Sequence, residues 1–381
     1  MEEEAVNIAI NLIYLSPNHD GGKDQVALNL LKGLQDNGTA DQYEVICWDY
    51  SVKTLRNLAP DAQYRVLKSK KRYGDNALRM LQTMYINTLK LRKIIKEDHI
   101  QVLFHIRYIN GLFKLPTKTV TIPHDIKDIT HRVLGTEKIP YYKYFIYKII
   151  YAFDFKHADA IIAISNFDKQ EITSFYPQYA KKVKMIYNPI LTDSYYLKIF
   201  DEKKYICAIN CQYHHKNIIT LIKAFEIIKE KIPYQLVLIG NIPPRVQYLK
   251  EYVEQHGLEQ AVIFTGFISD EKVDKILSQT ALYVNPSLFE GFGMTAVEAM
   301  MKKIPALVSD IPVNREVTFG FARYYDDLQN PEALAKAIMD CLDAPPDEKT
   351  LEQASEKLRY AFHYRKIAEE YHSFFSSRIE Q

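Results

Sequence analysis

A glycine-rich segment at residues 285–300 holds two glutamates whose spacing could serve chemistry. Apolar residues before it predict a strand and those after it a helix, so Gly291 and Gly293 fall on a strand-to-helix turn. A helix start offers free N–H groups and a positive dipole end, which suit a phosphate. Glu298, on the second helical turn, is an acceptor for paired hydroxyls such as those of a ribose. With Glu290 before the helix, the segment predicts a site for a sugar, a diphosphate and a ribose in line.

The same letters allow two other interpretations. Residues 291–296 also fit the dinucleotide pattern G-x-G-x-x-A, and Asp310 follows the next strand, which would suit an NAD-dependent oxidoreductase. Two features count against a dinucleotide site. The pattern requires its first glycine directly after the strand, whereas residues 286–290 intervene here. This strand–turn–helix segment also lies late in its domain rather than at its beginning. The third interpretation is an ordinary glycine turn with surface glutamates.

Further polar groups lie on other predicted strand-to-helix turns. Lys216 follows the strand at residues 205–209 and offers a compact positive charge to a leaving diphosphate. His124 follows a buried strand ending at residue 122, and Gly21 and Gly22 follow the first strand. Taken alone, each is also typical of an ordinary turn. Together they predict one shared site, because ligands of open parallel sheets bind beyond the carboxyl ends of the strands.

Cysteine usage indicates a reducing compartment. The four cysteines are too few for a disulfide framework. Cys207 and Cys211, with His214 and His215 close behind, could ligate a metal, but buried strand cysteines are the commoner explanation. We therefore expect no metal and no resident cofactor.

Alternating strands and helices predict an α/β protein with parallel sheets covered on both faces. The alternation of strands and helices begins again near residue 188, which predicts two Rossmann-like domains facing each other across a cleft. We expect an N-terminal domain at 1–187 and a second domain at 188–361, followed by a last helix at about 362–381.

Composition narrows the class of protein. The 381 residues are 47% hydrophobic and 25% charged with a net charge of +2, as in soluble globular proteins, and a nucleic-acid binder is usually more basic. The N-terminus has no apolar signal core, and no stretch is long enough to span a membrane. These features predict a cytoplasmic protein whose membrane contact, if any, is peripheral.

These motifs resemble those of retaining glycosyltransferases of family 4, which have the GT-B fold of two facing Rossmann-like domains. The resemblance covers nearly the whole chain. It is strongest in HKN, PSLFEGFG, VEAM and SDIPVNRE, with the Glu-x7-Glu pair as its specific part. It implies transfer of a sugar from a nucleotide-diphosphate sugar to a saccharide or lipid-linked acceptor, in surface polysaccharide or glycolipid assembly. A nucleotide-sugar epimerase, a phosphorylase and a non-catalytic binding protein of the same fold stay open.

The resemblance also implies domain and residue roles. The domain at 1–187 would be the acceptor side, the domain at 188–361 would bind the nucleotide sugar, and the helix at about 362–381 would cross back to the first domain. Glu298 would hold the ribose, Glu290 would lie near the donor sugar, and Lys216 would neutralise the diphosphate. His124 would abut the anomeric centre. The remaining donor-binding positions that it implies are Gly21, Gly22, Gly266, Phe267, Gly291, Phe292, Gly293, Met294 and Thr295.

One position departs from the family pattern. Many relatives carry a phosphate-binding arginine about five residues before the lysine, and here that position is Cys211. Lys23 or Arg315 are the candidates to share the phosphate charge. Which base the donor carries (UDP, GDP or ADP) stays open.

The first half of the chain is net positive and the second half net negative. Basic residues at 68–72 and 90–93, and interleaved Tyr and Lys at 141–148, predict a face that contacts an anionic inner membrane surface. The alternative is that residues 141–153 form a helix packed inside the domain, with its lysines solvated.

Overall fold

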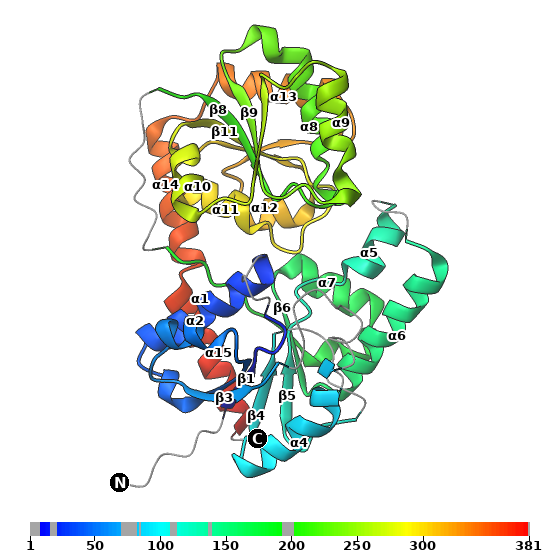
Figure 1. The fold of residues 1–381 in the computed structure, drawn as a ribbon, viewed down its shortest axis with the longest axis vertical. Helices are drawn as coiled ribbons and strands as arrows, with labels where there is room; N and C mark the ends of the chain where they lie inside the picture. Colours follow the sequence, from blue (N-terminus) through cyan, green and yellow to red (C-terminus); the bar gives the residue numbers. More distant parts are fainter. Residues whose placement is uncertain are drawn as a thin grey trace. The chain divides into compact units, whose positions relative to one another are not determined.

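The computed structural model describes residues 8–15, 21–69, 82–83, 85–106, 113–135, 139–192 and 202–379. The chain forms two compact units (Figure 1). Unit 1 comprises residues 1–133, 139–191 and 362–381, and unit 2 comprises Thr192–Ala361, with which Leu134–Lys138 is grouped. The basic residues at 70–72 lie outside the described residues.

Unit 1 is built on a parallel seven-stranded sheet of order β3-β2-β1-β4-β5-β6-β7. Its central strands are fully buried runs of apolar residues, as expected where helices cover both faces of a sheet. The strands are β1 (Ile8–Asn11), β2 (Tyr43–Trp48), β3 (Gln63–Leu67), β4 (Val102–His105), β5 (Lys118–Thr121), β6 (Ala160–Ala163) and β7 (Val183–Met185).

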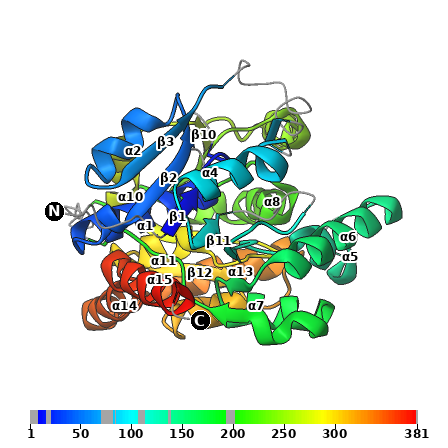
Figure 2. The same cartoon turned by 90° about the horizontal axis from the view of Figure 1, so that it is seen from below.

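The helices of unit 1 follow its strands in the expected alternation, and Figure 2 shows them from a second side. They are α1 (Gly22–Asp36), α2 (Val52–Leu58), the π-helical turn η2 (Ile86–Lys90), α4 (Leu91–Glu97), α5 (Lys127–Leu134), α6 (Tyr141–His157), α7 (Asn166–Phe175) and the C-terminal α15 (Tyr364–Ile379).

Helix α15 packs along α1 although more than 300 residues separate them in sequence. Gly33 allows this approach, because a Cβ there would lie 2.6 Å from the Cβ of Ala368 and 2.7 Å from the Tyr364 carbonyl oxygen. The Tyr364 hydroxyl donates to Asp36 at 2.7 Å. The last helix is thus an integral part of unit 1.

Unit 2 is built on a parallel six-stranded sheet of order β10-β9-β8-β11-β12-β13. Its strands are β8 (Tyr205–Ile209), β9 (Gln235–Ile239), β10 (Val262–Gly266), β11 (Thr280–Asn285), β12 (Ala306–Ser309) and β13 (Arg323–Tyr325). Its helices are α8 (Ile218–Ile228), α9 (Tyr248–Gln255), α10 (Asp270–Ser278), α11 (Met294–Met301), α12 (Pro312–Thr318), α13 (Pro331–Asp343) and α14 (Glu348–Ala361). With unit 1, this is the predicted pair of Rossmann-like sheets.

The predicted C-terminal helical stretch, 351–375, is broken in the structure. Helix α14 ends at Ala361 and α15 begins at Tyr364. Between them, Phe362 is fully buried with its ring edge-on to Tyr187, and its carbonyl accepts a hydrogen bond from the Ile190 N–H at 2.9 Å. The break therefore follows from contacts with a distant part of the chain.

The helices that the structure describes differ from membrane spans: none of them combines the length and the apolar composition needed to cross a bilayer.

Candidate active site

Glu290 is buried in unit 2 at the turn between β11 and α11. Its Oε1 accepts hydrogen bonds from Lys216 Nζ at 2.6 Å, Ser287 Oγ at 2.7 Å and Asn285 Nδ2 at 3.2 Å. Burial raises the pKa of Glu290, but the Lys216 cation and these donors outweigh it and hold the pKa below its usual value. The carboxylate is therefore ionised and fixed in one orientation.

Lys216 reaches Glu290 from the turn after β8, so the two turns meet, as the sequence predicts for neighbouring strands. Asn217 shapes this turn by adopting a left-handed conformation, with φ of 55°. Its side chain donates to the Leu328 carbonyl at 2.6 Å and accepts from Thr220 at 2.8 Å. The Leu288 N–H also donates to the His215 carbonyl at 2.8 Å, which ties the two turns together.

Helix α11 begins directly after Gly293, whose φ of 84° favours glycine over any residue with a side chain. A Cβ there would lie 3.3 Å from Oδ1 of the buried Asn314. The Phe292 side chain is buried, and Gly291, Met294 and Thr295 are partly exposed. The start of this helix therefore lies directly after the Glu290 turn, and a helix start is a position that can accept an anion.

Glu298 lies on the same helix and is partly buried. Burial raises its pKa to about 7, with Asp270 and Asp274 adding to the rise and Lys302 opposing it. Burial raises the pKa of the Tyr283 hydroxyl, and the nearby Cys207, Glu290 and Glu298 add to the rise. That hydroxyl donates to Thr295 Oγ1 at 2.8 Å.

The turns after β9 and β10 complete the carboxyl edge of the unit 2 sheet. The Gly240 N–H donates to the Gly266 carbonyl at 3.2 Å. The Phe267 ring is exposed, and its backbone N–H donates to Asn241 Oδ1 at 3.1 Å. An exposed aromatic ring at this edge can stack on a planar base.

The cysteines of unit 2 are buried thiols. Burial raises the pKa of Cys211 to about 12, so it stays protonated, and its Sγ points to the Ile239 carbonyl at 3.6 Å. Among the residues that the structure describes, no group of three or more His, Cys, Asp or Glu side chains could hold a metal.

Basic side chains near these turns differ in how they are engaged. Arg315 forms a bidentate pair with Asp310, at 2.5 Å for both contacts, which neutralises it. Arg245, which the sequence did not single out, donates from Nε to the Gln212 carbonyl at 2.8 Å. Its guanidinium lies 4.6 Å from the Tyr213 ring centroid, so an arginine does reach the turn that carries Lys216.

In unit 1, His124 follows β5 and is buried in a left-handed conformation with φ of 65°. Its Nε2 lies 2.9 Å from the Ile106 carbonyl oxygen, an acceptor, so Nε2 carries a proton. This contact fixes the orientation of the ring.

Lys23 lies at the start of α1, and its charge acts on Asp125, the residue after His124. Burial raises the pKa of Asp125, but Lys23, Lys127 and a backbone donor outweigh it and lower the pKa to about 2. Lys23 also acts on Asp168, whose pKa is nevertheless raised by burial to about 8. Gly21, with φ of 126°, and Gly22 begin α1 at this point. Because β1 and β5 are parallel strands of one sheet, the predicted turns that follow them lie at the same edge of that sheet.

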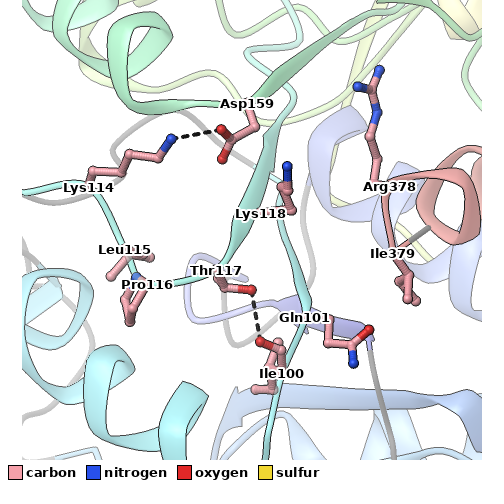
Figure 3. A pocket seen from close by; sticks show the side chains of 10 residues that line it. All are labelled: Ile100, Gln101, Lys114, Leu115, Pro116, Thr117, Lys118, Asp159, Arg378 and Ile379. Carbon is pink, nitrogen blue, oxygen red and sulfur yellow. Dashed lines mark hydrogen bonds and ion pairs between the residues drawn. The ribbon is translucent and has the colours of Figure 1, made fainter. Parts of the chain in front are cut away.

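A hollow of about 520 Å³ lies elsewhere in unit 1 (Figure 3). Its lining includes residues 100–101 and Asp159, which precede β4 and β6, so it opens at the amino ends of the strands. Lys114 pairs with Asp159 at 2.8 Å, and Thr117 donates to the Ile100 carbonyl at 2.8 Å. These contacts tie the strands together at the edge opposite the predicted turns.

Sequence reasoning missed the groups that orient Glu290. Asn285 and Ser287 are buried beside it, and Ser287 Oγ also lies 2.6 Å from Asn285 Oδ1. Polar residues at the end of an otherwise apolar strand were the available signal, because buried polar groups need partners.

Two family models match the chain in succession. Residues 20–194 match the model described as "Glycosyltransferase Family 4", and residues 193–358 match "Glycosyl transferases group 1". Together they cover most of both units.

Curated relatives are named glycosyltransferases. The chain is 26% identical to the O-antigen chain mannosyltransferase RfbU of Salmonella typhimurium, over 68% of this chain and 71% of that protein. It is 30% identical to the alpha-monoglucosyldiacylglycerol synthase of Streptococcus pneumoniae, over 48% of this chain and 41% of that protein. The match to the Escherichia coli mannosyltransferase WbdA, at 29% identity, spans 53% of this chain and only 26% of that protein. None of these names supports an oxidoreductase.

Solved structures share the fold. Anabaena HepE, in a crystal structure with UDP and glucose, superposes with a TM-score of 0.73 at 18% identity, covering 98% of this chain and 100% of that one. Sucrose-phosphate synthase from Thermosynechococcus elongatus gives a TM-score of 0.75 at 17% identity, covering 97% and 98%. The fold is therefore GT-B. With the two family matches, these findings show that the chain belongs to glycosyltransferase family 4 and is a glycosyltransferase.

Proposed function

We propose that this enzyme transfers a sugar from a nucleotide-diphosphate sugar, with retention of configuration, to a saccharide or a lipid-linked saccharide. We assign donor binding to unit 2 and acceptor binding to unit 1, which carries His124. The product belongs to surface polysaccharide or glycolipid assembly, as the names of the relatives suggest. The observation that carries the proposal is the buried Lys216–Glu290 pair beside the start of α11.

In the proposed reaction, the bond from the anomeric carbon to the diphosphate oxygen breaks and a bond to the acceptor oxygen forms on the same face. The acceptor proton passes to the leaving diphosphate. Lys216 and the N–H groups at the start of α11 stabilise the negative charge that develops on that diphosphate. We propose that these groups act without a metal ion or a resident cofactor.

Glu290 has a separate task in this scheme. Its Oε2 accepts none of the hydrogen bonds described above, all of which end on Oε1. A carboxylate held in this way can orient donor-sugar hydroxyls, while Glu298 receives the ribose hydroxyls and Phe267 stacks on the base.

The test is thermal shift with UDP, GDP, ADP and NAD, followed by turnover of the preferred nucleotide's sugar donors. We expect a shift with one nucleoside diphosphate and a loss of that shift in Lys216→Ala. The matched control is Lys336→Ala, because Lys336 is an exposed lysine paired with Asp340 on α13. Stabilisation by NAD alone would contradict the proposal. Acceptor-independent conversion of the donor to an epimer would instead identify an epimerase of this fold.

We further infer that the enzyme acts in the cytoplasm at the inner face of the membrane. Helix α6 of unit 1 carries the surface that would make this contact.

A further inference from the structure

Helix α6 of unit 1 exposes an apolar stripe to solvent. Its most exposed central members are Ile149 at 66%, Phe145 at 52% and Ile146 at 50%. In Figures 1 and 2, α5 and α6 lie at the periphery of unit 1. The side chains that form this surface, called here the α6 stripe, are Tyr141, Tyr142, Phe145, Ile146, Ile149 and Phe153.

The spacing of the stripe places it on one side of the helix. Its members recur at intervals of three, four and seven residues, which share a face at about 3.6 residues per turn. The opposite side is anchored, because Tyr151 and Phe155 are buried in the core with Ile172. The helix is thus neither loose nor wholly packed inside the domain.

The charge around the stripe is cationic. Lys143, Lys148 and Lys156 are exposed, and helical spacing places Lys143 and Lys148 on opposite margins of the stripe. The helix contains one acidic residue, Asp154, which is buried and accepts from Thr121 Oγ1 at 3.1 Å. The Arg132 guanidinium of α5 adds a cation 3.8 Å from the Tyr141 ring centroid.

We propose that the α6 stripe docks on the surface of an anionic bilayer. Apolar and aromatic side chains would enter the headgroup boundary, and the flanking lysines would reach anionic headgroups while their stems cover apolar surface. The lysines favour this occupant over an apolar protein partner, because negative headgroups complement cations on both margins. The inference rests on the proposed function in one respect, because docking would bring unit 1 to the lipid-linked acceptor of the proposed reaction.

Flotation of the full chain with vesicles tests the proposal. We expect recovery with phosphatidylcholine–phosphatidylglycerol vesicles, little recovery with phosphatidylcholine alone, and a decline as salt increases. Phe145→Ser with Ile149→Ser should abolish flotation. Lys143→Glu with Lys148→Glu should lower the partition coefficient at least ~20-fold, since each basic residue near the surface contributes about fivefold.

The matched controls lie on unit 2. Tyr360→Ser removes an equally exposed aromatic residue, and Lys336→Glu reverses an exposed lysine, so both should float as the parent does. Circular dichroism of every variant identifies any that fails to fold. If a variant does not fold, flotation is measured instead with the milder Ile149→Gln and Lys148→Gln exchanges, which should lower recovery in the same direction.

Equal flotation with neutral vesicles, or with the charge-reversed variant, would overturn the proposal. So would dimerisation of the parent protein that the stripe variants abolish, because the occupant would then be a second copy of the chain. Nucleoside-diphosphate binding, measured without vesicles, is the separate readout for the proposed function. Flotation without nucleotide binding contradicts that function alone, and binding without flotation contradicts docking alone.

Discussion

The Nζ of Lys216 lies 2.6 Å from Oε1 of Glu290, so the cation assigned to the diphosphate already has an internal counter-charge. Both side chains are largely removed from solvent, and Ser287 and Asn285 donate to the same oxygen. In the proposed scheme, a phosphate arriving at this turn would compete with Glu290 for Lys216. Glu290 would then affect both donor affinity and transition-state stabilisation.

Replacing Glu290 should separate these effects. In Glu290→Gln, the Lys216 charge is unopposed and the amide keeps an oxygen for the Ser287 donor. We expect nucleoside-diphosphate affinity to hold or rise, while kcat with the full donor falls by at least 100-fold (about 2.7 kcal/mol). Isothermal titration and initial rates measure the two. Glu290→Ala should also lower the free energy of unfolding by about 3–5 kcal/mol, because it leaves a buried cation unpaired. Unchanged turnover in both variants would refute the assigned role.

The raised pKa of Glu298 makes a prediction about pH. Its pKa is about 7 in the folded protein against an ordinary value of 4.5, so between these values the folded state binds more protons than the unfolded state. Glu298 should therefore cost stability as pH rises from 5 to 8, by roughly 1–3 kcal/mol. Glu298→Gln should remove this cost and be the more stable protein at pH 8, while binding nucleotide at least tenfold more weakly. The measurement is denaturant unfolding of both proteins at pH 5 and pH 8; parallel pH curves would contradict it.

His124 combines a left-handed backbone conformation with a buried ring. Substitutions can therefore separate the effect of the backbone on stability from the effect of the ring on turnover. Asparagine tolerates this conformation and alanine does so poorly. We expect His124→Asn to fold with close to parental stability but to lose turnover, and His124→Ala to lose turnover and about 1 kcal/mol of stability. Nucleotide binding to unit 2 should change little in either. Rates at saturating donor and thermal unfolding provide the data, and parental kcat in His124→Asn would exclude a catalytic role.

Cys211 occupies the position where many relatives carry an arginine, but here that position belongs to the apolar core. The thiol is fully buried in the core of unit 2, and a guanidinium there would be a buried charge. We expect Cys211→Arg to destabilise the protein by several kcal/mol without improving donor affinity. Cys211→Ala should cost about 1–2 kcal/mol and leave turnover intact. A folded Cys211→Arg variant with tighter nucleotide binding would contradict this expectation.

The contact between α1 and α15 predicts a stability effect far from the chemistry. Gly33→Ala places a methyl group 2.6 Å from the Cβ of Ala368, which should lower the free energy of unfolding of unit 1 by about 1–3 kcal/mol. Adding Ala368→Gly removes one of the two colliding groups and should restore part of the loss, although the Tyr364 carbonyl remains at 2.7 Å. Urea unfolding of the single and double variants measures this. No recovery in the double variant would assign the clash to the backbone alone.

Local pattern predicted the fold where strands are buried on both faces. The predicted strands at 43–48 and 205–209 coincide with β2 and β8, because continuous apolar runs bounded by turns are unambiguous in an α/β chain. The edge strand β3 was missed because its QYRVL sequence is half-exposed, and β13 because it has only three residues. The break at Phe362 has no glycine or proline signal and depends on Tyr187 and Ile190.

For the candidate site, the sequence predicted which turns belong together but not the side-chain contacts between them. The strand-to-helix turns predicted that Lys216 and Glu290 belong to one site, and in the structure the strands before them, β8 and β11, are adjacent. Their direct pairing, across 74 positions of the sequence, depends on side-chain geometry that spacing does not encode. Arg245 was missed for the same reason, because it comes from the loop after β9 and contacts the β8 turn only through folding.

The return of the last helix has a consequence for the order of events during synthesis. Unit 2 is drawn almost entirely from one uninterrupted stretch of chain and can be completed as it leaves the ribosome. The N-terminal part of unit 1 is translated before unit 2, yet Ala368 and Tyr364, which pack against Gly33, are translated after it. One flank of α1 should therefore stay uncovered until unit 2 has been synthesised.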